Sequence, residues 1–420
     1  MAVADVLKEG LAMRDAVLII GGGLLQIPAI HIGRDMGLVV VVTDGNPKAP
    51  GMELADEAVP LDIYDLAGHQ RLVTQLAARY RLCGVFAEGA DVELTVAVTA
   101  QQAGLPGIPV EAARRCKNKA LMRQAFDQAG LGQVPWGEAS TTQEARSWAE
   151  KIGVPVAIKA VDNCGSRGFT RVTALDDVES AFLRAASAST TGTALVEACL
   201  TGTEQSVELL FDAAGSCHRL NVVDRIFGEG PWAVELGHVN PSQLHGAVQQ
   251  DLLALAERAA VAVGVRFGAF KADTILTADG PRILEVTARL SGGFDCQYTT
   301  PLATGRNFIR AALSLAVGRA LDPEDLRGSW QRCAAAWTVF PEPGVVQAIT
   351  GVDAALALPG VKHVFLRSRV GEVIPPYRDC VARPAFVIVE GHDADEVLAR
   401  AKAAAAMVQI KTVMEPVPVA

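Results

Sequence analysis

The sequence predicts a mixed α/β and α+β chain built of three units. Apolar strands alternate with helices over residues 16 to about 110, which is typical of a doubly wound parallel sheet. Runs suited to antiparallel pairing follow, including a hairpin at 267–288. Four short strands and one helix come after about residue 330 and predict a small α/β unit. We place the units at 1–110, 111–325 and 326–420.

The first unit begins with a buried strand at 16–20 that ends in three glycines. We expect further strands at 38–42 and 84–87, and helices to Met36, near 67–80 and at 91–103. The glycine turn matches the start of a dinucleotide motif, and Asp44 lies where a ribose-binding acid would. Gln26 replaces the third small residue of that motif, so an NAD(P)-dependent oxidoreductase is the weaker alternative.

The second and third units mix helices with strands. We expect helices at 111–133, 142–152, 176–188 and 247–263, and strands at 154–160, 169–172, 194–197, 205–211 and 219–226. Pro135 to Glu138 breaks the pattern, and Glu235 to Ser242 is polar and rich in turn residues. In the third unit we expect strands at 334–339, 344–349, 361–366 and 385–390, followed by a helix at 393–407.

Composition limits the compartment and the partners. The net charge of −9 gives no polyanion-binding surface, so a nucleic-acid partner is not expected. The eight cysteines are scattered without a CxxC pair, which favours reduced thiols and disfavours zinc. Asp5, Lys8 and Glu9 interrupt any leader-like apolar run, and the glycines, Gln26 and Pro28 make 16–33 a poor membrane span. We expect a cytoplasmic protein without a membrane partner.

The hairpin at 267–288 is the most informative segment. If Ala278, Asp279 and Gly280 form a three-residue loop, Thr277 faces Pro281 and Asp273 faces Glu285. Two carboxylates opposite each other repel, which is tolerated where a cation lies between them. Oxygen ligands without Cys or His nearby favour Mg²⁺. The alternative is a solvated hairpin face.

Two further segments carry candidate nucleotide contacts. The loop after Lys159 contains Gly165, Ser166 and Gly168, small residues that let backbone N–H groups approach a polyphosphate, although an ordinary hairpin loop has the same composition. Glu197 ends an apolar strand where an adenine edge could be bound, and Glu204 could bond ribose hydroxyls. Taken alone, each glutamate fits a solvated surface charge better. His238 is equally a substrate contact or a loop residue.

Taken in order, these segments resemble the ATP-grasp superfamily, specifically its carboxylate–amine ligases such as the L-amino acid ligases (dipeptide synthetases). The resemblance covers nearly the whole chain and rests on VLIIGGG, VVTDGNPKAP, KNKALMRQA, GVPVAIKAVDNCGSRGFTRV, LVEACLTGTEQSVELL and LEVTARLSGG. It implies an N-terminal pre-ATP-grasp domain, a central ATP-grasp domain with a lid at about 134–195, and a small C-terminal domain.

The resemblance also implies roles for individual residues. Lys119 and Lys159 would hold the ATP phosphates and Ser166 and Gly168 would fold over them, while Glu197, the backbone at Ala198 and Leu200, and Glu204 would hold the nucleoside. Asp273 and Glu285, with Thr287, would hold Mg²⁺, and Arg289 would be the catalytic arginine. Candidate substrate contacts are Glu88, Asp91, Glu235, His238, Ser291, Gly292 and Gly293.

Three positions depart from the family pattern. Position 273 is Asp where Glu is commoner, position 287 is Thr where Asn is usual, and Lys271 stands where many dipeptide-forming members carry His. The expected function is ATP-dependent joining of a carboxylate, such as an amino acid, to an amine through an acyl phosphate. One or two Mg²⁺ ions are implied, with Mn²⁺ as a substitute, and a homodimer is expected. A nucleotide-biosynthesis ligase or carboxylase, or a non-catalytic nucleotide sensor, is the alternative on the same fold.

Overall fold

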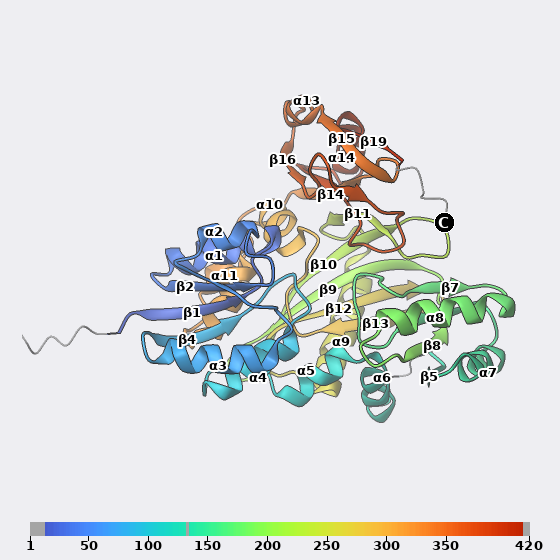
Figure 1. The fold of residues 1–420 in the computed structure, drawn as a ribbon, viewed down its shortest axis with the longest axis horizontal. Coiled ribbons are helices and arrows are strands. Elements are labelled where there is room, and N and C mark those ends of the chain that lie inside the picture. Colours follow the sequence, from blue (N-terminus) through green and yellow to red (C-terminus); the bar gives the residue numbers. More distant parts are fainter. Residues whose placement is uncertain (1–12, 132–133, 415–420) are drawn as a thin grey trace, which may run out of the picture.

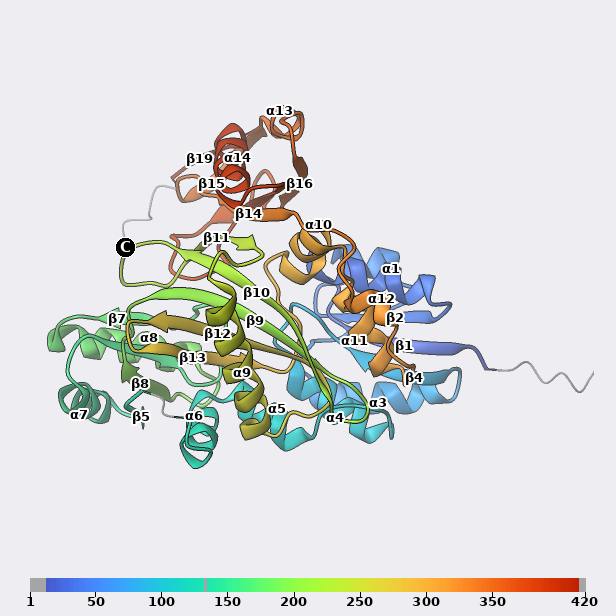
Figure 2. The ribbon, with the colours of Figure 1, turned by 180° about the vertical axis from the view of Figure 1, so that it is seen from behind.

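The computed structural model describes residues 13–131 and 134–414. The first twelve residues, on which much of the argument against a leader depends, lie outside this part, as do residues 132 and 133 of the predicted helix 111–133. The described residues form three units around a large central sheet (Figures 1 and 2).

The N-terminal unit is the doubly wound parallel sheet that the sequence predicts. Its strands lie in the order β3-β2-β1-β4, all parallel: β1 (Asp15–Ile20), β2 (Val39–Asp44), β3 (Glu57–Pro60) and β4 (Arg81–Phe86). A short turn of helix η1 (Leu24–Gln26) leads into α1 (Ile27–Asp35), and α2 (Pro50–Leu54), α3 (Leu66–Ala77) and α4 (Glu93–Gln102) follow. Apolar residues of α3 and α4 cover one face of the sheet.

The other face of this sheet is covered partly by a helix from far along the chain. α11 (Phe308–Ala316) packs with α1 against Val17, Val40 and other strand residues (Figure 1). We had assigned residues 308–316 to the central domain by sequence order. The amphipathic helix instead buries its apolar face on the N-terminal sheet, which ties the first and second units together.

One predicted helix is two. α5 (Val110–Lys117) and α6 (Lys119–Gln128) are separated by Asn118, whose backbone is extended. The Asn118 side chain accepts hydrogen bonds from the N–H groups of Ala120 at 2.9 Å and Leu121 at 3.0 Å. This cap starts α6 afresh and places Lys119 at its first position.

The lid is a separate antiparallel sheet with strand order β5-β8-β6-β7. Its elements are β5 (Trp136–Ala139), α7 (Thr142–Ile152), β6 (Val156–Ala160), β7 (Thr170–Val172), η2 (Leu175–Asp177), α8 (Val178–Ala188) and β8 (Ala194–Ala198). The helices pack on one face of the sheet. Pro135–Glu138 interrupts the helical pattern as expected, and the segment that follows Pro135 pairs with β8 as an edge strand that the sequence did not predict.

The central sheet has eight strands in the order β13-β12-β9-β10-β11-β14-β18-β16. The second unit supplies β9 (Thr203–Phe211), β10 (Cys217–Phe227), β11 (Glu235–Asn240), β12 (Gly268–Thr277) and β13 (Gly280–Thr287), and α9 (Gly246–Val263) packs against them. The turn-rich interpretation of 235–242 was wrong over most of its length. β11 is held between β10 and β14, and pairing on both sides outweighs its polar composition.

The C-terminal unit is not separate from this sheet. A π-helical turn η3 (Asp295–Thr299), α10 (Thr300–Thr304) and α12 (Pro323–Leu326) lead to β14 (Cys333–Val339), β16 (Val361–Leu366) and β18 (Ala385–Gly391), which extend the central sheet. A second sheet contains β15 (Gly344–Thr350), β17 (Val373–Ile374) and β19 (Gln409–Val413). α13 (Val352–Leu356) and α14 (Ala394–Met407) complete the unit.

The β12–β13 hairpin reaches the predicted pairing by an unpredicted route. Thr277 faces Gly280, so the tip has two residues instead of the three that we expected. The register shifts by one residue between Asp273 and Thr274, where Leu284 is left over on β13. This bulge cancels the error at the tip, so that Asp273 faces Glu285, as predicted, and Lys271 faces Thr287.

Candidate active site

A cavity of about 1070 Å³ lies where the three units and the lid meet. It collects all but three of the predicted site residues. Those lining it are Asp91, Lys119, Lys159, Ser166, Glu197, Ala198, Leu200, Glu204, Glu235, His238, Asp273, Glu285, Arg289, Ser291, Gly292 and Gly293. Residues scattered over about 200 positions of the sequence therefore line one cavity.

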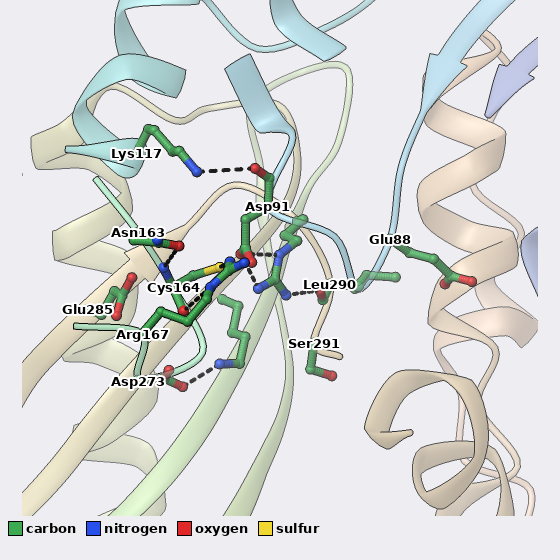
Figure 3. Close-up of polar contacts among 12 residues, drawn as sticks. Glu88, Asp91, Lys117, Asn163, Cys164, Arg167, Asp273, Glu285, Leu290 and Ser291 are labelled. Atoms are coloured by element: carbon green, nitrogen blue, oxygen red, sulfur yellow. Dashed lines mark hydrogen bonds and ion pairs between the residues drawn. The ribbon is translucent and has the colours of Figure 1, made fainter. Parts of the chain in front are cut away.

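Glu88, Gly168 and Thr287 are not part of that lining. Glu88 is fully buried, and its side chain points away from Asp91 and Ser291 in Figure 3. Gly168 has a φ of +76°, and a Cβ there would lie 2.8 Å from the Ala188 side chain. The glycine is thus required where the phosphate loop packs against α8, and this placement differs from the phosphate contact that we expected.

Glu197 is a buried ion-pair centre and not a solvated surface charge. It is 2% exposed and accepts hydrogen bonds from Arg123 Nε at 3.0 Å, while Lys159 Nζ lies 2.5 Å from its Oε1. Burial raises the pKa of Glu197, but the charges of Arg123 and Lys159 outweigh it and the net shift is downward. Arg123 also donates to the carbonyls of Ile283 and Leu284, so it joins the lid to the hairpin.

The sequence argument missed Arg123, although the signal was present. Arg123 lies four positions after Lys119 on one helix, so the two side chains share a face. Lys119 Nζ lies 3.0 Å from Glu285 Oε1 and also contacts the Asn163 carbonyl of the phosphate loop. α6 therefore directs Lys119 toward Glu285 of the hairpin and Arg123 toward Glu197 at the end of β8.

Asp273 and Glu285 face each other, but each has its own cations. Arg225, on β10, lies 3.0 Å from Asp273 Oδ1, 3.0 Å from Glu235 Oε1 and 3.8 Å from Glu204 Oε2. Lys271 contacts the same oxygen of Asp273. Burial raises the pKa of Asp273, but Arg225 and Lys271 bring it below its ordinary value. Arg225 was not predicted because its partners come from three other strands.

The hairpin fits a divalent cation held together with a polyphosphate. Asp273 and Glu285 offer two carboxylates, and Mg²⁺ bound with a nucleotide needs only one or two from the protein. The hydroxyls of Thr287 and Ser206 are buried and have no hydrogen-bond partner among the described residues. Ser206, on β9, pairs with Asp273 of β12 and lines the cavity. No group of three or more Asp, Glu, His or Cys side chains gathers as a metal site in 13–131 and 134–414.

Arg289 follows the hairpin and is held by the N-terminal unit. Its Nε donates to Asp91 Oδ1 at 3.0 Å, its Nη2 contacts the same oxygen, and its Nη1 donates to the Leu290 carbonyl at 2.8 Å. Burial raises the pKa of Asp91, but the Arg289 charge and the Cys164 thiol together bring it well below its ordinary value. The Asp91 carboxylate is thus engaged by protein groups.

The loop after Arg289 rests on a carboxyl group that the sequence argument did not select. The N–H of Ser291 donates to Glu208 Oε1 at 2.8 Å, and Glu208 is fully buried on β9. Burial and the nearby Asp295 raise the pKa of Glu208 to about 7. Glu208 lies opposite Lys271 in the β9–β12 pairing. The alternation that places Glu204 and Glu208 on one side of β9 was the signal available in the sequence.

Glu235 and His238 lie on β11 at the edge of the C-terminal unit. Glu235 lies 3.5 Å from Arg383, and burial, which raises its pKa, is outweighed by Arg225 and Arg383, so that the pKa is about 2. His238 Nε2 lies 2.9 Å from Thr299 Oγ1, and burial lowers the pKa of His238. Both side chains line the cavity, Glu235 as a carboxylate anion and His238 mostly as a neutral imidazole.

The glycine turn after β1 is filled by its own chain. Gln26 Oε1 accepts a hydrogen bond from the N–H of Gly23 at 2.9 Å. A Cβ atom added at Gly21 would lie 3.3 Å from the Gln26 side chain. Asp44 accepts from the N–H of Gly22 at 2.8 Å. Gln26, the residue that departs from the dinucleotide motif, therefore covers the glycine turn. Asp44, the acid expected to bind a ribose, accepts a hydrogen bond from this turn instead.

Comparisons with known proteins agree with this architecture. Residues 152–297 match the model of the ATP-grasp domain. The crystal structure of an L-amino acid ligase from Bacillus licheniformis superposes with a TM-score of 0.81 at 22% identity, covering 95% of this chain and 99% of that one. A biotin carboxylase domain of the Hydrogenobacter thermophilus 2-oxoglutarate carboxylase, in complex with MgADP, superposes at 0.72 with 21% identity, covering 95% and 91%. The fold and the site define an ATP-grasp enzyme, a class that uses ATP and Mg²⁺.

A second match is more specific. Residues 336–413 match the L-amino acid ligase C-terminal domain 2. A formate-dependent phosphoribosylglycinamide formyltransferase from Burkholderia vietnamiensis is 25% identical over 415 residues, 94% of this chain and 95% of that protein. Residues 152–297 and 336–413 thus match domains of ATP-grasp ligases, and these homologues indicate an ADP-forming enzyme that makes C–N bonds, as the sequence predicted. In the described residues, no helix combines the length and apolar character needed to cross a bilayer.

Proposed function

We propose that this protein is an ATP-dependent ligase that joins the carboxylate of an amino acid or a related acid to an amine. One observation carries the proposal. Asp273, Glu285, Lys119, Lys159 and Arg289 line the same cavity as Glu235 and His238 of β11. The nucleotide and the acceptor would thus bind in one cavity, which acyl transfer between them requires.

The first step would be attack of the substrate carboxylate on the γ-phosphorus of ATP. The residues act mainly by positioning and charge neutralisation. Lys119 and Lys159, which pair with Glu285 and Glu197, line the cavity and would hold the phosphates. Mg²⁺ held by Asp273 and Glu285 would neutralise the outer phosphates. The products of this step are an acyl phosphate and ADP.

The second step would be attack of the amine on the acyl carbon, with loss of phosphate. Arg289 donates hydrogen bonds from a buried position and would steady the anionic tetrahedral centre. His238 is buried and its pKa is lowered by burial, so it is a neutral acceptor suited to the amine proton. The phosphate loop would exclude water, which would otherwise hydrolyse the acyl phosphate.

The match of residues 336–413 to an L-amino acid ligase domain favours amino acids as substrates. The long match to a phosphoribosylglycinamide formyltransferase favours a second candidate, a ligase of nucleotide biosynthesis with a phosphorylated acceptor. We infer Mn²⁺ as a substitute for Mg²⁺, a homodimer and a cytoplasmic location as parts of the same proposal.

The test is phosphate release from ATP with a panel of amino-acid pairs, followed by mass spectrometry of the product. Amino-acid-dependent release without a bicarbonate requirement is expected. Asp273→Asn combined with Glu285→Gln should abolish it, since both hairpin carboxylates lose their charge. Asp279→Asn, at the exposed tip of the same hairpin, is the matched control and should retain full rate. Release that depends only on phosphorylated amines would favour the second candidate.

A further inference from the structure

Three loops, one each from the N-terminal unit, the lid and the end of the β12–β13 hairpin, meet at Asp91. Asp91 lies between β4 and α4, Cys164 lies in the phosphate loop between β6 and β7, and Arg289 follows β13 (Figure 3). The thiol of Cys164 donates to Asp91 Oδ2, while Arg289 donates to Asp91 Oδ1. One carboxylate thus holds the phosphate loop with one oxygen and the catalytic arginine with the other.

The contacts on both sides of this junction are fixed. Arg167 Nη2 lies 2.7 Å from the Cys164 sulfur, and its Nε donates to the Cys164 carbonyl at 3.0 Å. The Cys164 N–H donates to Asn163 Oδ1 at 2.9 Å, and Asn163 Nδ2 donates to the Ala188 carbonyl of α8 at 2.7 Å. The backbone of Cys164 is therefore tied through Asn163 to α8 of the lid. If the lid moves, the thiol moves with it.

The chemistry of Cys164 suits a hydrogen-bond donor and not a nucleophile. Burial, together with the charge of Asp91, raises the pKa of the Cys164 thiol to about 12. The S–H group is retained at neutral pH and points its proton at a carboxylate. This explains a cysteine among small residues in a loop where the sequence argument found no use for it.

We propose that Cys164 and Asp91 are positioning residues that align Arg289 only when the phosphate loop is closed. The Arg289 side chain is 13% exposed, and its Nε and Nη2 are oriented by Asp91 Oδ1, while the Cys164 thiol holds Oδ2 of the same carboxylate. Opening of the loop removes the thiol from Oδ2, so the carboxylate can turn and no longer fixes the guanidinium. Closure over ATP would thereby complete the catalytic arrangement, and acyl transfer would begin only in the water-excluded state. This inference rests on the proposed function for Arg289.

The first test is a double-mutant cycle on turnover. Cys164→Ala should lower kcat about tenfold or more, because a displaced catalytic group is costly, and should change the KM for ATP less than twofold. Cys164→Ser keeps a donor and should restore kcat to within about twofold of wild type. Asp91→Asn should lower kcat, and adding Cys164→Ala to it should have no further effect. Cys217→Ala, which removes a half-buried thiol outside the cavity, is the matched control.

Two results would overturn the proposal. One is equal loss of kcat in Cys164→Ala and Cys164→Ser, which would mean that the thiol does not act as a donor. The other is a full additive loss when Cys164→Ala is combined with Asp91→Asn, which would mean that the two residues act separately. Either result is distinct from failure of the proposed function, in which wild-type protein releases no phosphate with any substrate pair.

A second measurement needs no substrate. Hydrogen–deuterium exchange of the amides at 162–168 should be faster in Asp91→Asn than in wild type, since the loop loses its tie to the N-terminal unit. Exchange in Cys217→Ala should match wild type. Unchanged exchange of this loop in Asp91→Asn would contradict the tie between Asp91 and Cys164, whatever the protein's activity.

Discussion

Arg123 is the largest fully buried side chain of the described residues, and it shows how one residue joins the lid to the β12–β13 hairpin. Its guanidinium neutralises Glu197 at 2.8 Å and donates to two carbonyls of β13. A buried ion pair gives little net stability relative to apolar replacement of both partners, but losing one partner leaves an uncompensated charge. Arg123 therefore fixes the position of Glu197, the residue expected at the adenine edge, relative to the β12–β13 hairpin.

We expect Arg123→Met to lower the free energy of unfolding by about 3 kcal/mol, the lower end for a broken buried pair because Lys159 still contacts Glu197. Urea denaturation measures it. Arg146→Met, which removes an exposed i,i+4 pair with Glu150 on α7, should cost less than about 0.5 kcal/mol. Equal effects of the two substitutions would show that the Glu197 carboxylate is not held as described.

Glu208 gives a pH-dependent prediction at the same scale. Burial, with Asp295 nearby, raises its pKa to about 7, above the unfolded value of about 4.3. The protonated form is favoured in the folded state, so this contribution to stability is complete below pH 4 and is lost as the pH rises through 7. Glu208→Gln should match wild type near pH 4.5 and be more stable, by up to about 3 kcal/mol, at pH 8.

Urea midpoints at the two pH values measure this difference. Glu257→Gln on α9, whose partner is the half-exposed Arg219, should change the free energy of unfolding by less than about 0.5 kcal/mol at either pH. The same gap between Glu208→Gln and wild type at pH 4.5 and pH 8 would contradict a raised pKa. Because the comparison is between variants, the titration of His69 and His238 cancels.

At the scale of elements, the cap at Asn118 links helix geometry to the site. Without its side chain, the first N–H groups of α6 lose their acceptor, which typically costs about 1 kcal/mol. Lys119 is the next residue and contacts Glu285, so Asn118→Ala should also raise the KM for ATP several-fold. Thr141→Ala removes the cap of α7 far from the cavity. It should lose similar stability in thermal denaturation and leave the KM for ATP unchanged.

The elements also show what the sequence could and could not predict. The apolar strands predicted at 16–20 and 38–42 and the helix predicted at 142–152 are confirmed as Asp15–Ile20, Val39–Asp44 and Thr142–Ile152. The hairpin pairing was right although its tip was wrong, because a bulge leaves no local signal in composition. β11 and β5 were missed because their strand state comes from neighbours far along the chain.

The same limit applies to the site. Residues carried by ordered motifs, such as Lys159 and Arg289, were identified and lie in the cavity. Arg225 was missed because its three acidic partners belong to β9, β11 and β12, and no spacing in the sequence reveals a contact between strands. Glu88 was selected as a candidate substrate contact, but its side chain is fully buried, contacts the Cys296 thiol and does not line the cavity.

At the scale of the whole molecule, the central sheet runs without interruption from the metal hairpin into the C-terminal unit. β11 pairs with β14 over Gly237 to Asn240, and Val239 of β11 belongs to the C-terminal core together with Val387 of β18. Two units that share a sheet and a core residue cannot unfold independently without exposing apolar surface. The C-terminal unit therefore forms one wall of the cavity and contributes to the stability of the central sheet.

We accordingly expect the central and C-terminal units to unfold in one calorimetric transition. Val387→Ala and Val207→Ala remove methyl groups from fully buried positions of the C-terminal and central cores, and each should cost about 2 kcal/mol. Both should move the same transition to lower temperature, because either loss is felt by the continuous sheet. Val370→Ala, at a position that is 63% exposed, should move no transition. If Val387→Ala instead splits off a separate low-temperature peak while Val207→Ala does not, the β11–β14 pairing does not couple the units, and the cavity wall formed by Arg383 and Phe386 would open independently of the ATP-grasp core.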